Sequence, residues 1–207
     1  MVYKISPYHF SAIKRGIDLT LSLIGLLALW PLYLLISLLL KLINHEPIFF
    51  VQARVGKNGK TFSMFKFRTM TVGAHTKQKN FKKQNEADGP VFKIRNDPRF
   101  TKFGKVLAHT GFDELPQLIN VLKGEMSLVG PRPLPISEAI RVPGKYKARS
   151  LIKPGITSTW VIGGSHSMGF KKWMELDLKY IKQASLALDI KVLMSTLGVL
   201  VKSILGR

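Results

Sequence analysis

The sequence predicts an α-rich α+β protein with two parts: an N-terminal re-entrant membrane helix hairpin (1–43) and a small cytoplasmic domain (44–207). Three observations support this prediction. A long uncharged apolar stretch lies near the N-terminus, two strand-like segments flank a glycine-containing turn at 44–70, and amphipathic helical patterns at 170–183 and 185–205 indicate interfacial helices. At 207 residues, the chain is long enough to form one domain with its own core.

The charge balance is strongly basic, with 32 Lys+Arg against 12 Asp+Glu and a formal net charge of +20. Such a surplus favours polyanionic partners, namely nucleic acid, an anionic lipid membrane or phosphorylated small molecules. The chain contains no cysteine, which excludes disulfides and thiolate chemistry, and its five histidines show no zinc-ligand spacing. Because no nucleic-acid-binding motif is recognisable, we expect no nucleic-acid partner.

The segment Leu19–Leu40 carries no charged residue. As a helix it would be about 33 Å long, close to the ~30 Å hydrocarbon core of a bilayer. It is too long for a signal peptide and no small-residue cleavage site follows it. Lysines and arginines flank both ends, which favours the cytoplasmic side for both, and Pro31 near the middle is expected to kink the helix. We therefore expect a helix–break–helix that enters and leaves by one leaflet; a kinked single span is the alternative.

Residues 44–70 are expected to form a β-hairpin, because IFFVQARV and TFSMFKFRTM are strand-like and turn residues separate them. Side chains alternate along a strand, so Lys66 and Arg68 are expected on one face and Phe65 and Phe67 on the other. Two cations on one face would form an anion clamp; a solvated strand face is the alternative.

The following segment is expected to connect the hairpin to the next helices. Thr71–Pro90 is polar and basic and is predicted to be a surface helix or a mobile loop. A short strand is expected at 91–94 and a turn at 96–99, in which Asp97 caps the local structure or contacts substrate. Thr101 is predicted to cap a helix that extends to about His109.

Asp113 and Glu114 are the only adjacent carboxylates in the sequence. Gly111 is expected to end the preceding helix, Asp113 to take the N-cap position of the next one, and Pro116 to lie in its first turn. A helix N-terminus is positively polarised and stabilises carboxylates and phosphates. The pair is therefore a candidate site of chemistry, although its spacing alone favours an N-cap and a first-turn acid.

The next motif is Gly130-Pro131-Arg132-Pro133. Two prolines restrict the backbone on either side of Arg132, which suits a guanidinium that binds a phosphate with two hydrogen bonds. A plain turn with an exposed arginine is the alternative.

The C-terminal region is predicted to contain two helices. Residues 170–183 are amphipathic, and packing against the core is the preferred interpretation. Residues 185–205 are apolar with scattered charges, which suggests a helix lying on the membrane; burial against the domain is the alternative.

Five motifs occur in one order along the chain: KFRTM (66–70), NDPRFTKFGKVL (96–107), DELPQLINVLKGEMSLVGPRP (113–133), KPGIT (153–157) and LDLKYI (176–181). With them the chain resembles the bacterial sugar transferases, which are monotopic polyprenyl-phosphate phosphoglycosyl transferases that prime exopolysaccharide, O-antigen and capsule synthesis. The resemblance covers nearly the whole chain.

The resemblance implies that 44–207 is a catalytic domain at the cytoplasmic face of the bacterial inner membrane. Asp113 corresponds to the family's nucleophile and Glu114 to the glutamate associated with Mg²⁺. The implied reaction transfers a sugar-1-phosphate from a UDP-sugar to undecaprenyl phosphate through a phosphosugar-aspartyl intermediate and releases UMP. The expected substrate-binding residues are Lys66, Arg68, Asp97, Arg99, Gln117, Pro131, Arg132 and Pro133.

The chain departs from the family pattern at several positions. Ala108 replaces an arginine that many members carry five residues before the nucleophile, and Val161 and Ser165 replace a glutamine and an arginine after the PGIT turn. Trp30 replaces a serine that often precedes the membrane proline. These departures leave open a catalytically weak relative that acts as a membrane-bound assembly partner. The sequence does not determine the sugar, the downstream pathway or the oligomeric state, for which a homodimer stays open.

Overall fold

The computed structural model describes residues 4–162 and 168–205. The α-helices are α1 (Ala12–Ala28), α2 (Trp30–Asn44), α3 (Lys102–Thr110), α4 (Gln117–Leu122), α5 (Ile136–Ala139), α6 (Thr159–Ile162), α7 (Phe170–Gln183) and α8 (Leu186–Ile204). The strands are β1 (Phe49–Val55), β2 (Thr61–Phe67), β3 (Ser127–Val129) and β4 (Gly155–Thr157). Short 3-10 helices are η1 (Pro7–Phe10), η2 (Lys57–Gly59), η3 (Thr76–Gln84), η4 (Phe112–Glu114) and η5 (Gly144–Leu151). The mixed, helix-rich class is confirmed.

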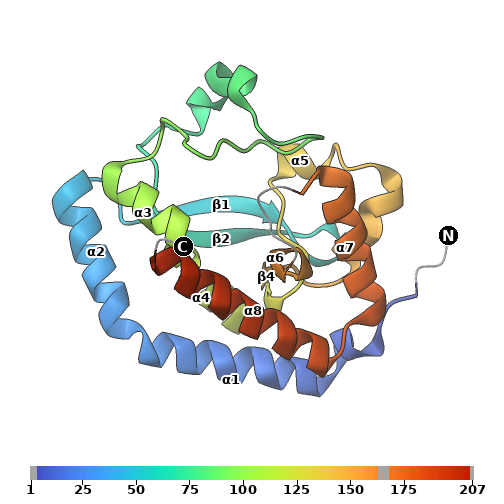
Figure 1. The fold of residues 1–207 in the computed structure, drawn as a ribbon. Coiled ribbons are helices and arrows are strands. Elements are labelled where there is room, and N and C mark those ends of the chain that lie inside the picture. The colour runs from blue at the N-terminus through green and yellow to red at the C-terminus, as the bar shows by residue number, and fades with distance from the viewer. Residues whose placement is uncertain (1–3, 163–167, 206–207) are drawn as a thin grey trace.

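Helices α1 and α2 form a broken helix along two edges of the domain (Figure 1). Their axes bend by 59° at Leu29, and Pro31 lies in the first turn of α2, where its missing N–H costs no hydrogen bond. The predicted break is therefore present, but it lies at Leu29 and not at Pro31 itself. At this angle the two helices form an open bend and do not run antiparallel.

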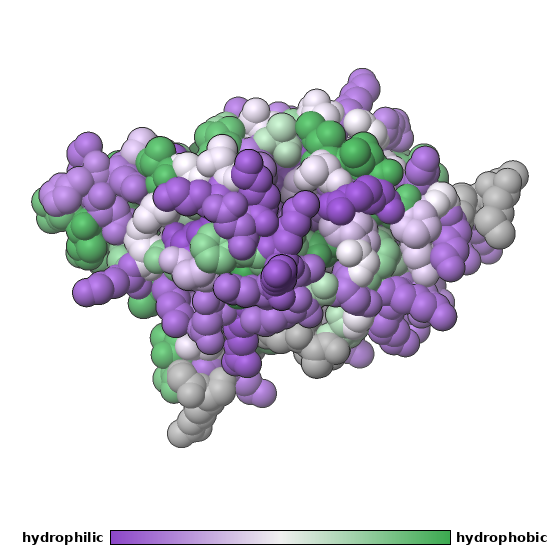
Figure 2. Space-filling view, turned by 90° about the horizontal axis from the view of Figure 1, so that it is seen from above, coloured by the Kyte–Doolittle hydropathy of each residue, from purple (hydrophilic) through white to green (hydrophobic). Residues whose placement is uncertain are grey.

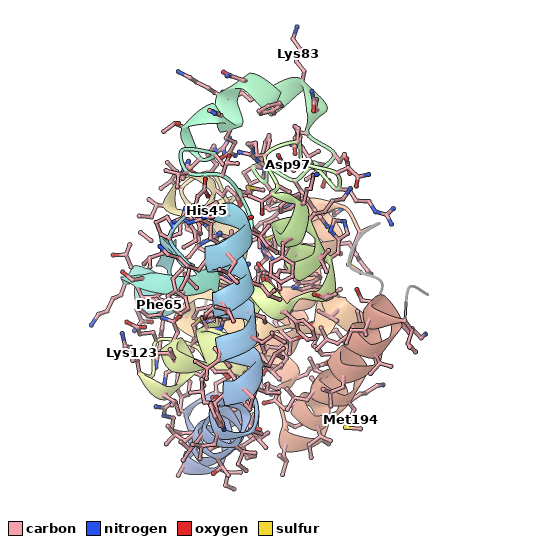
Figure 3. The ribbon with its side chains drawn as sticks, turned by 90° about the vertical axis from the view of Figure 1, so that its left-hand side faces the viewer. His45, Phe65, Lys83, Asp97, Lys123 and Met194 are labelled. Carbon is pink, nitrogen blue, oxygen red and sulfur yellow. The ribbon has the colours of Figure 1, made fainter. Side chains whose placement is uncertain are left out.

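Within the described residues, no helix taken alone has the length and apolarity needed to cross a membrane. The bent pair α1–α2 meets that requirement only when its two helices are taken together. Both helices expose large apolar side chains along their outer faces, and so does α8, where Met194 points away from the domain (Figure 3). The opposite face of α8 is buried at Asp189 and Val192. Helix α8 therefore packs on the domain along one face, as the second interpretation of 185–205 expects, and leaves an apolar face uncovered; its placement on a membrane stays a prediction.

A buried ionic cluster fastens α1 to the C-terminal helices. Lys14 Nζ lies 2.6 Å from Asp189 Oδ2 and 3.3 Å from Asp18 Oδ1. The Tyr180 hydroxyl donates to Asp189 Oδ1 at 2.7 Å, and Asp18 Oδ1 accepts from the Leu128 amide at 3.0 Å. Lys14, which appeared in the sequence to be a cation flanking the membrane segment, is therefore an internal residue that joins α1, β3, α7 and α8.

The predicted β-hairpin is confirmed. Strands β1 and β2 pair antiparallel, with Phe50 opposite Lys66. A second, parallel pair joins β3 to β4, with Ser127 opposite Gly155. The chains approach so closely there that a Cβ on Gly155 would lie 2.1 Å from the Gly130 amide nitrogen, so a side chain is excluded at that point.

The connecting segments agree with the sequence in part. Thr101 Oγ1 accepts from the Gly104 amide at 3.0 Å and so caps α3, and Gly111 ends that helix at a φ of 77°, as predicted. The strand expected at 91–94 is wrong, since those residues form no regular structure. The basic segment after the hairpin contains η3, a surface helix on which Lys83 points into solvent (Figure 3). The segment lies at the top of the molecule in Figure 1, and the surface seen from above is mainly hydrophilic (Figure 2).

Candidate active site

Asp113 and Glu114 lie in η4, between α3 and α4. The side chain of Asp113 is 9% exposed and that of Glu114 is 28% exposed, so the first carboxylate is sealed and the second reaches a more open space. The predicted N-cap role of Asp113 is wrong. Pro116 occupies the position before α4, and the hydrogen bond that the Asp113 carboxylate accepts comes from Lys66.

Lys66 bridges the two carboxylates. Its Nζ lies 3.2 Å from Asp113 Oδ2 and 2.7 Å from Glu114 Oε1. The lysine comes from β2, far from η4 in sequence, so the fold and not local spacing assembles this triad. The predicted importance of Lys66 thus has a structural counterpart, in that one ammonium stabilises two adjacent negative charges.

The environment drives the pKa values of the two acids in opposite directions. Burial, together with the charge of Glu114, raises the pKa of Asp113 even though Lys66 opposes the shift. Burial also disfavours the ionised form of Glu114, but Lys66 and Arg132 outweigh it and lower the pKa of Glu114. Burial opposes the charge of Lys66 as well, yet the two carboxylates raise the pKa of that ammonium. Paired acids with diverging pKa values are typical of sites with divided chemical roles.

A pocket borders this triad on the side of Glu114. It is lined by Arg54, Met64, Lys66, Glu114, Gln117, Arg132, Pro133, Gly155 and Ile156. Three cations against one carboxylate make the pocket suitable for an anion with several charges, such as a diphosphate. The pocket brings together five of the predicted residues: Glu114 and the expected substrate-binding residues Lys66, Gln117, Arg132 and Pro133.

The predicted turn around Arg132 is held through the carbonyls of its last three residues. Pro131 O accepts from the Gly155 amide at 2.9 Å, Arg132 O from Arg149 Nη2 at 2.7 Å, and Pro133 O from an Arg54 guanidinium nitrogen at 3.1 Å. These bonds fix the backbone that directs the Arg132 side chain into the pocket. The interpretation of a rigid arginine turn therefore agrees with the geometry.

Sequence reasoning did not identify Arg54, Arg149 or Asp177 as site residues. Arg54 lines the pocket, and burial together with Arg132 lowers its pKa to about 10. Strand alternation could have found it, because Arg54 follows Phe50 by four residues and so shares the face of Lys66. Arg149 pairs with buried Asp177 at 2.9 Å, a contact between segments whose spacing carries no signal.

Three other predicted residues, Arg68, Asp97 and Arg99, make contacts away from the pocket lining. Arg68 lies over the ring of Phe50, on the face of Lys66 as predicted, but its guanidinium donates to the carbonyls of Pro47 and Phe49. Arg68 does not line the pocket that Lys66 lines, and a joint role of the two cations in binding an anion stays a prediction.

Asp97 and Arg99 pair with each other, at 2.5 Å between Asp97 Oδ2 and Arg99 Nη2, and Arg99 also donates to Ala74 O at 3.0 Å. Asp97 lies below η3 in Figure 3, where its carboxylate also accepts from the Arg99 amide. This local capping matches the first of its two interpretations, and a substrate role for Asp97 and Arg99 stays a prediction. Of the departures from the family pattern, Ala108 is half-buried in α3, Val161 lies in α6, and Ser165 falls outside the described residues.

Among the residues that the structure describes, no three His, Cys, Asp or Glu side chains are arranged to hold a metal ion. A cage made of protein ligands alone does not fit here. The more open carboxylate of Glu114 does fit Mg²⁺, which is commonly bound through one or two carboxylates plus phosphate oxygens of a substrate.

A buried carboxylate, its bridging lysine and an adjoining cationic pocket suit the binding of a phosphorylated molecule and make this the candidate active site. Comparison with known proteins then gives the family: the bacterial sugar transferase model matches residues 9–203, so the chain belongs to the bacterial sugar transferase family.

Three relatives illustrate the similarity. The galactosyl transferase CpsE of Streptococcus agalactiae serotype III is 39% identical over 202 residues, which cover 96% of this chain and 45% of the relative. The undecaprenyl-phosphate glucose phosphotransferase of Komagataeibacter xylinus is 39% identical over 198 residues, which cover 89% of this chain and 35% of the relative. The exopolysaccharide production protein ExoY of Sinorhizobium fredii is 35% identical over 188 residues, which cover 89% of this chain and 83% of the relative. The chain thus spans less than half of the first two relatives and most of the third.

Proposed function

We propose that the protein transfers a sugar-1-phosphate from a UDP-sugar to undecaprenyl phosphate, through a covalent phosphosugar intermediate on Asp113, and releases UMP. The observation that carries the proposal is the Asp113–Lys66–Glu114 triad beside a pocket of three cations. The names of relatives, which include an undecaprenyl-phosphate glucose phosphotransferase and a UDP-galactose-lipid carrier transferase, support the classes of donor and acceptor.

In the first step, an ionised oxygen of Asp113 attacks the phosphorus that bears the sugar. A bond forms between that oxygen and the phosphorus, and the bond to the bridging oxygen of the diphosphate breaks, so UMP leaves with that oxygen and its electron pair. Lys66 favours the ionised form of Asp113, while Arg54 and Arg132 balance the charge of the diphosphate.

In the second step, a phosphate oxygen of undecaprenyl phosphate attacks the same phosphorus. The acyl phosphate bond breaks, Asp113 regains its carboxylate, and the product is a lipid-linked diphosphate sugar. Two displacements at one phosphorus replace a direct transfer between a soluble donor and a membrane-bound acceptor.

Glu114, together with phosphate oxygens of the substrate, would hold Mg²⁺. Bound there, Mg²⁺ supplies positive charge that neutralises the diphosphate. Lys66 occupies Oε1 of Glu114, which leaves the second oxygen of that carboxylate for an ion. Gln117, Pro131 and Pro133 are proposed to shape the nucleotide-sugar pocket around Arg132.

We place the protein at the cytoplasmic face of the bacterial inner membrane, with α1–α2 entering and leaving by one leaflet and the exposed face of α8 against anionic lipid. The exposed apolar faces of these three helices support this placement. Because the natural chain has no cysteine, single cysteines introduced at residues 4 and 45 report the topology directly. We expect an impermeant maleimide to label both from the same side; labelling from opposite sides would exclude the re-entrant arrangement.

The reaction is tested with detergent-purified protein, Mg²⁺ and a panel of UDP-sugars, by following UMP release with and without undecaprenyl phosphate. We expect Mg²⁺-dependent release with at least one donor and sustained turnover only with the acceptor. A folded protein that releases no UMP from any donor would instead support the catalytically weak assembly partner that Ala108 and Val161 leave open.

A further inference from the structure

A second pocket lies at the N-terminal end of α1, on residues that the proposed reaction does not use. Its lining includes His9, Lys14, Arg15, Asp18, Ser127 and Lys153. None of its lining residues also lines the pocket beside Glu114. The two pockets therefore share no lining residue, and each is lined by three cationic side chains.

The charge of Lys14 is balanced by Asp18 and Asp189, but that of Arg15 is not balanced by a carboxylate in the described part of the chain. Arg15 donates from Nη1 to Val121 O at 2.7 Å and from Nη2 to Leu122 O at 2.9 Å. These bonds to the end of α4 hold the guanidinium in a fixed position. They leave a full positive charge at the edge of the pocket.

Lys153 places a second charge beside it. A Cβ atom added to Gly124 would lie 3.6 Å from both Arg15 Nη2 and Lys153 Nζ. The two cations therefore face the same small space. Lys153 is half-buried, and within the described residues its ammonium has no ion-pair partner. Burial lowers the pKa of Lys153, and Arg15 lowers it further, although the Asp18 carboxylate opposes the shift; Lys57 and Lys14 add smaller lowering effects.

Lys57 and two apolar side chains complete the surroundings. Lys57, in η2, lies with its Nζ 4.7 Å from the centre of the Phe10 ring. Phe10, which is 56% exposed, lies just before α1, and Ile13, which is 63% exposed, lies in the first turn of that helix. Cations next to exposed apolar and aromatic side chains, at the start of a membrane-associated helix, match the boundary between lipid headgroups and acyl chains.

We propose that Arg15, Lys153 and Lys57 bind the phosphate of an anionic phospholipid headgroup and so fix the depth of α1 at the membrane surface. The same cations would accept inorganic phosphate, so the test separates the two sources. The proposal rests on the membrane placement proposed above and is independent of the chemistry at Asp113.

The test follows thermal unfolding of the full-length protein in detergent during titration with dihexanoyl phosphatidylglycerol, dihexanoyl phosphatidylcholine or inorganic phosphate. A ligand that binds the folded state raises the melting temperature with its concentration. We expect phosphatidylglycerol to stabilise far more than phosphatidylcholine, whose choline cation is repelled by the cluster. Stabilisation by inorganic phosphate equal to that by phosphatidylglycerol would overturn the lipid assignment, and equal effects of the two lipids would overturn the site.

Variants locate the effect. Lys153→Gln is expected to need about tenfold more phosphatidylglycerol for the same stabilisation, which corresponds to about 1.4 kcal/mol. Lys153→Arg, which keeps the charge, and Lys172→Gln, which removes an exposed lysine from α7, are expected to match the wild type. A Lys153→Gln curve identical to that of Lys172→Gln contradicts the proposal. Lys153→Gln is expected to release UMP at the wild-type rate. If neither the wild type nor any variant releases UMP, the proposed reaction is contradicted, but the lipid titration still tests this site because it measures only the melting temperature.

Discussion

Two lysines in this protein each bridge two carboxylates, and the two clusters differ in what else surrounds the acids. Lys14 joins Asp18 to Asp189, and Lys66 joins Asp113 to Glu114. The acids of the first cluster accept further hydrogen bonds from Ser127, the Leu128 amide, Tyr8 and Tyr180. In the described residues, the hydrogen bonds to the side chains of Asp113 and Glu114 come from Lys66 alone.

This difference separates a structural cluster from a chemical one. A saturated buried ion cluster holds elements together, and removing one partner leaves an uncompensated charge. Carboxylate oxygens without further donors, next to a cationic pocket, remain available to a substrate and an ion. A lysine between two acids is therefore not in itself a sign of catalysis. What distinguishes a catalytic cluster from a structural one is whether the carboxylates can still accept hydrogen bonds from a substrate.

The largest contrast is expected between two aspartate-to-asparagine variants. Asp113→Asn should lower turnover by roughly 10³-fold or more, because the nucleophile is lost. Since burial raises the folded-state pKa of Asp113 above its unfolded value, the ionised carboxylate reduces stability at neutral pH, and the variant should keep or raise the melting temperature.

Asp18→Asn is the matched control. It should lower the melting temperature, because Asp18 balances Lys14 and accepts from Leu128, while the folded fraction should retain its turnover. Parallel UMP-release and thermal-unfolding measurements check both variants. The comparison fails if Asp18→Asn abolishes turnover at unchanged stability.

Lys14→Met should destabilise the protein by about 3 kcal/mol, the usual scale for removing one partner of a buried ion cluster. Lys66→Met, in a site partly open to solvent, should lose less stability and more activity. Chemical denaturation of both variants in the same detergent measures the difference. Equal losses of stability would mean that the two clusters have the same role.

The pH profile of kcat/KM should reveal how Lys66 acts. Lys66 lowers the pKa of Asp113 against the effect of burial, so removing the cation raises that pKa further. Activity is then lost at a higher pH as the solution is acidified, and the acid limb of Lys66→Met lies above that of the wild type. Lys66→Arg keeps the charge and should leave the limb near its original position. An acid limb that does not move in Lys66→Met argues against this electrostatic role.

A smaller effect is expected at Arg149. Its guanidinium binds Asp177 and Arg132 O together, and lysine cannot reproduce both contacts. Arg149→Lys should raise the KM for the UDP-sugar about fivefold, the equivalent of one hydrogen bond of about 1 kcal/mol, with kcat little changed. Steady-state kinetics separate the two parameters, and a fall in kcat alone would place Arg149 in another role.

The smallest effect is expected for Ala108→Arg, which restores the cation common in the family. Activity should rise or stay unchanged in the UMP-release assay. A severe loss would show that the space around α3 is built differently here.

Much of this organisation could be predicted from the sequence, because local patterns encode it. The strand-like segments on either side of a turn predicted the hairpin, and Thr101 and Gly111 predicted the limits of α3. The apolar stretch with Pro31 predicted the broken helix. The contacts that assemble the site lie between distant segments. The bonds from Arg54 and Arg149 to the turn around Arg132 depend on tertiary packing, which no spacing records. The expected strand at 91–94 failed because a short apolar run packs equally well without strand pairing.

The central claim is that Asp113 carries the phosphosugar, and intact-protein mass spectrometry tests it most directly. Wild-type protein incubated with Mg²⁺ and its UDP-sugar, without acceptor, should gain the mass of one phosphosugar, mapped by peptide analysis to Asp113. The adduct should disappear when undecaprenyl phosphate is added and should be absent from Asp113→Asn. An adduct on another residue, or UMP release by Asp113→Asn at the wild-type rate, would contradict the account.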